Sequence, residues 1–76
     1  MTRTYTIVLD PDADEGGYSV LVPSLPGCIT QGGSVEECLE RAREVIALHI
    51  AALVDDGEPV PEEQEHPQLL TVTIPA

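Results

Sequence analysis

Two short segments near the N-terminus place large apolar residues at every second position. In YTIVL, residues 5–9, the apolar face carries Tyr5, Ile7 and Leu9. In YSVLV, residues 18–22, it carries Tyr18, Val20 and Val22. A period of two is typical of strands in a sheet that is covered on one side, so both segments are predicted to be strands.

Prolines and glycines delimit a third short strand. Pro23 and Pro26 end the pairing of the second strand, because proline has no N–H to donate, and Gly27 turns the chain. CITQ, residues 28–31, is then long enough for a strand, and Gly32 closes it. Three adjacent strands joined by tight loops predict an antiparallel meander.

The hydrophobic period changes to 3.6 after the third strand. Ser34 and Glu37 have the spacing of a capping box, which marks the start of a helix. Apolar residues then recur at steps of three and four as far as Leu53. Gly57 is the expected residue just past the helix end, and Pro59 prevents continuation. The pattern predicts one helix of about 22 residues, roughly 33 Å long.

The two halves of this helix differ in polarity. The first half has acidic residues such as Glu36 and Glu40 on its outer side, whereas residues 45–54, VIALHIAALV, include only one polar side chain, His49. A helix that is apolar all round must be covered all round, and one sheet covers only one side. A second subunit or a partner is therefore expected on the outer residues Leu48, Ala51 and Val54, and the chain is predicted to form a homodimer or a higher homo-oligomer.

The C-terminal part is predicted to be a linker followed by a strand. Residues 58–68, EPVPEEQEHPQ, are acidic, rich in proline and without periodicity. Residues 69–75, LLTVTIP, alternate again and could return parallel to the first strand through a right-handed crossover. The predicted fold class is α+β in the order β-β-β-α-β, as a single domain over residues 1–76 with no DNA-binding domain.

The acidic segment DPDADEGG, residues 10–17, could be read as a metal loop or as a turn. Asp10, Asp12 and Asp14 match the first, third and fifth ligands of an EF-hand loop. The sixth position, which needs glycine, is Glu15, and the twelfth, which needs glutamate, is Leu21. A hairpin loop that happens to be acidic is therefore predicted.

Charge indicates the kind of partner. Fourteen acidic residues stand against three arginines, giving a net charge of −11 at pH 7. Such a chain would repel nucleic acid, whose phosphates need clustered Lys or Arg. It would attract a basic protein, although solubility alone could also explain the acidity.

Cysteine spacing and hydropathy indicate the compartment. Cys28 and Cys38 follow no signal peptide, so free thiols and a cytoplasmic location are expected. Both cysteines are expected to be buried and inert, and His49 is expected in the core or an interface. With His66 these residues lack the paired spacing of a zinc site, and no apolar run approaches the roughly 20 residues that cross a bilayer. No metal, cofactor or membrane insertion is predicted.

Five short motifs, in one order and without gaps, resemble the HicB-like antitoxin family. They are GYSV, PSLPGC, TQG, EEC and DGEPVP, and their characteristic residues are Gly17, Tyr18, Pro23, Pro26, Gly27, Cys28, Gly32, Gly57 and Pro59. The resemblance implies a partial ribonuclease-H-like fold and neutralisation of HicA, a small basic RNA-cleaving toxin. Many family members carry a DNA-binding segment after this domain, and this chain ends after its last predicted strand. Turns and helix ends are enough to explain the motif glycines and prolines without a ligand.

Two other functions compete with an antitoxin. A stand-alone oligomeric binding or scaffold protein without a toxin partner fits the same pattern. A metal-dependent nuclease would need carboxylates from the first strand, the helix and the last strand to hold two metals about 3.5–4 Å apart. Neither predicted strand contains a carboxylate, and Glu44 alone cannot build that site. No catalytic residue is therefore expected, and the chain is predicted not to be an enzyme.

Overall fold

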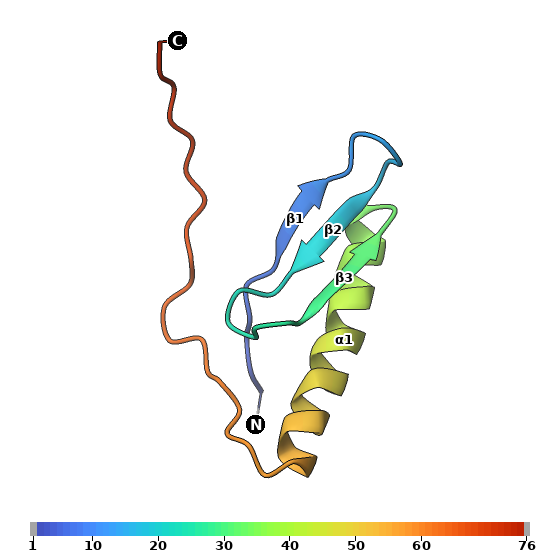
Figure 1. The fold of residues 1–76 in the computed structure, drawn as a ribbon, viewed down its shortest axis with the longest axis vertical. Coiled ribbons are helices and arrows are strands. Elements are labelled where there is room, and N and C mark those ends of the chain that lie inside the picture. Colours follow the sequence, from blue (N-terminus) through green and yellow to red (C-terminus); the bar gives the residue numbers. More distant parts are fainter. Residues whose placement is uncertain (1, 76) are drawn as a thin grey trace.

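The structure, a computed structural model, describes residues 2–75. It contains three strands followed by one helix, as Figure 1 shows: β1 Val8–Pro11, β2 Tyr18–Leu21, β3 Ile29–Gly32 and α1 Val35–Asp55. The strands form an antiparallel meander in the order β1-β2-β3. The α+β class expected from the two hydrophobic periods is confirmed.

The helix packs on one face of the sheet and creates a small core in two parts. Val20 of β2 meets Cys38 and Ala42 of α1 in the first cluster. The second cluster lies beyond the strand ends and contains the buried residues Val22, Leu25 and Cys28. On the opposite face, the cross-strand row of Val8, Leu21 and Ile29 is open, with Leu21 47% and Ile29 65% exposed.

Both predicted helix ends are present, with one difference in detail. The hydroxyl of Ser34 accepts the N–H of Glu37 at 3.1 Å. The Glu37 carboxylate accepts the N–H of Gly33 at 3.1 Å instead of that of Ser34, one residue earlier than in a standard capping box. At the C-terminal end Gly57 has a φ of 71°, and the N–H of Glu58 reaches the carbonyl of Leu53 at 2.9 Å. This is the Schellman ending that glycine makes possible.

The first strand begins three residues later and ends two residues later than the alternation predicted. Its register pairs Asp10 with Ser19 and Pro11 with Tyr18, and the N–H of Asp12 still reaches Gly17 O at 2.9 Å. Before Val8, the same register would pair Thr6 with Pro23. Proline has no N–H to donate, so the pairing of β1 with β2 stops there. The acidic segment therefore starts inside the hairpin. Its turn is closed by the Asp12 carboxylate, which accepts the N–H groups of residues 14 and 15 at 3.0 and 3.1 Å.

The predicted C-terminal strand is wrong for the isolated chain. Within residues 2–75, no hydrogen bond joins residues 69–75 to the sheet, and this segment has no regular secondary structure. Figure 1 shows it as an extended arm that runs on the side of β1 and continues past the end of the sheet. The alternation is a real property of the segment, but a strand also needs a neighbouring strand to pair with. The parallel return of a ribonuclease-H-like sheet is thus not formed.

Residues 58–68 have no regular secondary structure, as predicted. They run from the end of α1 back to the N-terminal segment, where they contact Arg3 and Tyr5. No helix in the described part of the chain is long and apolar enough to span a membrane.

Candidate protein-interaction site

One outward stripe of α1 gathers all the residues that the sequence pointed to as an interface. Steps of three and four residues connect Glu36 and Glu40 with Ala51 and Val54 on the side away from the sheet, and Leu48 borders them. All five are exposed, Leu48 at 71% and Val54 at 61%. We call this surface the outer stripe, and it consists of residues 36, 40, 44, 47, 48, 51 and 54.

The outer stripe changes character along its length. Its N-terminal half carries the carboxylates of Glu36, Glu40 and Glu44, and two glutamates lie in the first turn, where the helix dipole favours negative charge. Its C-terminal half is apolar. An exposed apolar patch beside a charged one is typical of a surface that binds another protein, since apolar contact supplies burial and charge supplies orientation.

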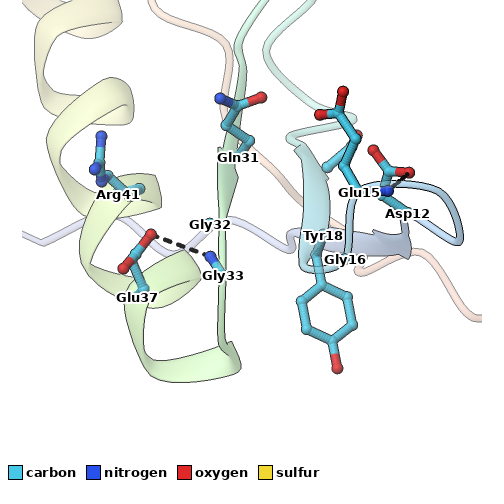
Figure 2. Close-up of a pocket in the computed structure, with 10 residues that line it drawn as sticks. Asp12, Glu15, Gly16, Tyr18, Gln31, Gly32, Gly33, Glu37 and Arg41 are labelled. Atoms are coloured by element: carbon cyan, nitrogen blue, oxygen red, sulfur yellow. Dashed lines mark hydrogen bonds between the residues drawn. The ribbon is translucent and has the colours of Figure 1, made fainter.

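A shallow polar pocket of about 240 Å³ lies beside the start of the helix, between the β1–β2 loop, β3 and α1. Figure 2 shows its acidic side chains Asp12, Glu15 and Glu37 around Gly16, Gly32 and Gly33, with Arg41 one turn further along the helix from Glu37. Two of these carboxylates are already engaged by main-chain N–H groups of their own turns. The pocket is a by-product of two caps that lie side by side.

The motif glycines in this region are explained by close packing. A Cβ atom on Gly17 would lie 2.6 Å from the carbonyl oxygen of Gly32. A Cβ atom on Gly32 would lie 2.8 Å from Sγ of Cys38. Both distances are shorter than any non-bonded carbon contact allows, so these glycines bring the hairpin, β3 and α1 together.

The PSLPGC motif closes the second hydrophobic cluster. The N–H of Leu25 donates to Val22 O, and that of Cys28 donates to Leu25 O, both at 3.0 Å. Leu25 is fully buried as a result, and Gly27, with a φ of 83°, turns the chain between them. Burial raises the pKa of the Cys28 thiol, which disfavours the reactive thiolate. Cys28 and Cys38 are both buried and free.

Sequence reasoning missed a polar cluster around Glu63, in the segment interpreted as a plain surface linker. The Glu63 carboxylate accepts the N–H of Thr6 at 2.9 Å, its hydroxyl at 2.7 Å and the hydroxyl of Ser24 at 2.9 Å, and it also contacts His66 Nδ1. Only 1% of the Glu63 side chain is exposed. The Thr6 N–H, together with both hydroxyls and His66, lowers the pKa of Glu63 to about 2, although burial acts in the opposite direction.

Glu63 fastens the linker to the start of the first strand. Its partners are 57 and 39 residues away in sequence, so no local pattern could have indicated them. Neighbouring contacts act in the same way: the Tyr5 hydroxyl donates to Pro61 O at 2.6 Å, and Arg3 pairs with Glu62 at 3.3 Å. The side chain of His66 is 61% exposed and contacts Glu63.

This cluster does not have the geometry of a hydrolase. A catalytic triad uses one histidine nitrogen for the acid and the other for the nucleophile. Here Nδ1 of His66 faces both Glu63 and the Thr6 hydroxyl, the latter at 3.4 Å, and the hydroxyl itself donates to the carboxylate. Across residues 2–75, no three His, Cys, Asp or Glu side chains lie close enough to hold a metal ion. His49 is half-buried on the sheet side of α1.

Comparison with known proteins decides the family. Residues 5–72 match the family described as HicB_like antitoxin of bacterial toxin-antitoxin system. The chain belongs to the HicB-like antitoxin family. The resemblance found in the motifs is therefore confirmed, and so is the prediction that the chain is not an enzyme, because this family consists of antitoxins.

Relatives of this HicB-like chain fall into two size groups. A UPF0150 protein of Synechocystis sp. is 41% identical over 59 residues, which are 78% of this chain and 73% of that protein. A UPF0150 protein of Archaeoglobus fulgidus is 48% identical over 56 residues, 71% of this chain and 80% of the relative. Antitoxin HicB of Escherichia coli K12 is 35% identical over 57 residues, 75% of this chain but only 41% of that longer protein.

Proposed function

We propose that this chain is an antitoxin that binds and neutralises a small basic HicA-type toxin, an RNA-cleaving protein. Membership of the HicB-like family is the observation that carries the proposal. The acidity of the chain, −11 at pH 7, supports it, because a basic partner would be attracted before contact.

The outer stripe of α1 is the surface proposed for the toxin. Its three glutamates orient a basic protein, and its exposed Leu48 and Val54 supply apolar contact at the other end. Interfaces that combine an apolar centre with a charged rim bury enough surface for specific binding. Neutralisation then follows from covering the surface with which the toxin holds RNA.

Charge reversal on the outer stripe tests this placement. The double variant Glu36→Lys with Glu40→Lys should raise the Kd for a HicA-type toxin at least tenfold at low salt, as measured by calorimetry. The matched control is Asp14→Lys with Glu15→Lys in the exposed β1–β2 loop, which changes the net charge equally. It should change the Kd less than about threefold.

The outcomes distinguish binding through the outer stripe, binding through net charge alone, and no binding to the toxin. Equal effects of both double variants would mean that net charge, and not the outer stripe, directs binding. Absence of binding by the unmodified chain at low salt would overturn the antitoxin proposal itself.

Self-association through the apolar half of the outer stripe is the second candidate function. The exposure of Leu48 and Val54 favours it, since a small domain gains from covering such residues. On this alternative the chain is a homo-oligomeric binding or scaffold protein. Either function is proposed for the cytoplasm, where two free buried cysteines stay reduced.

A further inference from the structure

An apolar groove of about 740 Å³ lies between α1 and residues 3–7, the segment that precedes β1. Its apolar lining comes from both elements and consists mainly of Tyr5, Ile7, Leu39, Ala42, Ile46 and Ile50. Leu39 is 41% exposed, so this surface is open to solvent. From Leu39 to Ile50 the helical wall of the groove is about 16 Å long.

The charge around this groove is opposite to that of the chain as a whole. Fourteen acidic residues and three arginines give the chain a net charge of −11. Two of those arginines, Arg3 and Arg43, nevertheless line the groove, one from each wall, and none of its lining residues within the described chain carries a carboxylate. The groove therefore combines apolar surface with positive charge.

Both guanidinium groups are available to a ligand. Arg3 pairs with Glu62 at 3.3 Å, but the two side chains are 34% and 65% exposed, and exposed ion pairs of this kind stabilise a protein little. Among residues 2–75, Arg43 forms no ion pair with a carboxylate. A guanidinium can bind a carboxylate through two parallel hydrogen bonds. An anionic group in the groove would thus supply a contact that the chain does not supply to Arg43.

The charges favour a small anionic ligand over a protein in this groove. A basic toxin would be repelled by the two arginines. A second copy of the chain carries the same charge of −11, and repulsion between two molecules grows with the product of their charges. A ligand with a single carboxylate meets far less of this repulsion. Small-molecule sites are typically apolar, have volumes of about 300–1,000 Å³ and contain a few charged groups that fix the orientation of the ligand.

We propose that this groove binds a medium-chain fatty acid. The alkyl chain lies along Leu39, Ile46 and Ile50, and the carboxylate binds the guanidinium of Arg43, with Arg3 on the opposite wall. An extended chain of about ten carbons is about 12 Å long and so fits within the length of the helical wall. The inference goes beyond the proposed function, because the groove shares only Ala47 with the outer stripe.

An NMR titration of the full chain with decanoate tests whether the groove is occupied. We expect saturable shifts of the methyl groups of Ile7, Leu39, Ile46 and Ile50, with a Kd below about 1 mM, which is reasonable for a ligand of this size. Shifts that do not saturate, or that are confined to Leu48 and Val54 of the outer stripe, would overturn the proposal. It would also be overturned if dilution of the unliganded protein moved the groove signals, because a second copy would then occupy the groove.

A matched pair of arginine variants tests the placement of the carboxylate. Arg43→Gln should raise the Kd for decanoate about fivefold or more, because one charge-assisted contact is lost. Arg41→Gln is the control, since Arg41 is also exposed on α1 and is not part of the groove, and the net charge changes equally. It should change that Kd less than about twofold.

Decan-1-ol, which has no carboxylate, is the control ligand. Its Kd should be almost the same for the unmodified chain and for both variants. Equal effects of the two variants on decanoate binding, or an equal loss of decanol and decanoate binding in Arg43→Gln, would overturn the proposal. No toxin is present in these experiments, so failure of the antitoxin proposal would leave their outcome unchanged.

Discussion

The carboxylate of Glu63 accepts both the main-chain N–H and the hydroxyl of Thr6, at 2.9 and 2.7 Å. This contact lies just before the start of β1, where pairing with β2 stops, and it holds the linker that leads to residues 69–75. A residue of the linker thus determines how both ends of the chain are placed.

Stability should depend on this contact in a defined pH range. Because the pKa of Glu63 is lowered from 4.5 to about 2, its contribution is complete above pH 4.5 and is lost as the pH falls toward 2. Glu63→Gln should lower the Tm at pH 7 and remove this part of the acid dependence. Thermal melts of both proteins between pH 2 and 7 measure it. Parallel curves for the two proteins would contradict the assignment.

Two adjacent glycines should respond differently to the same substitution. Gly16 and Gly17 have similar φ values of 79° and 75°, but a Cβ on Gly16 meets nothing within 4 Å, whereas one on Gly17 meets Gly32 O at 2.6 Å. Gly16→Ala should cost about 1–2 kcal/mol from backbone conformation alone. Gly17→Ala should cost more, because main-chain atoms must also move. Denaturant melts giving equal losses for both would show that the hairpin relaxes freely.

Leu48→Glu should weaken any assembly that uses the outer stripe. Leu48 is 71% exposed in the single chain, and a charge there would be buried in an apolar contact. We expect the dimer Kd from light scattering to rise at least tenfold, with Glu40→Gln as a control that changes little. An unmodified chain that is monomeric at tens of micromolar would assign Leu48 to the toxin-facing surface instead.

Association with the toxin should depend on salt mainly through its rate. Added salt screens the field of a −11 chain over a Debye length of about 8–10 Å and so slows encounter. Dissociation breaks short-range contacts and should change little. Stopped-flow measurements from 20 to about 300 mM salt separate the two rates. An association rate independent of ionic strength would remove electrostatic attraction from the account.

Helix ends and core positions could be predicted from the sequence, because residues close together in the chain determine them. The capping pair Ser34 and Glu37 and the terminal Gly57 correctly marked both ends of α1, since each acts within a few residues. Alternation correctly placed Val20 and Val22 in the core. The candidate interface residues, from Glu36 to Val54, lie on one exposed helix face because helical spacing determines that face, and their role in binding stays a prediction.

Long-range relationships were beyond the reach of these signals. The role of Glu63 depends on Thr6 and Ser24, which are far away in sequence and have no pattern that points to a linker carboxylate. The fate of residues 69–75 depends on where that linker is fastened. The alternation of apolar residues shows that residues 69–75 can pair as a strand. The sequence pattern does not show which strand of a sheet they can approach, because that depends on the fold.

Neutralisation of toxin activity is the most direct test of the central claim. A HicA-type toxin would be assayed for cleavage of a messenger RNA while the purified chain is titrated into the reaction. We predict that cleavage falls in proportion to added chain and stops near stoichiometric amounts. Cleavage that continues unchanged with the chain in tenfold excess at low salt would contradict the account.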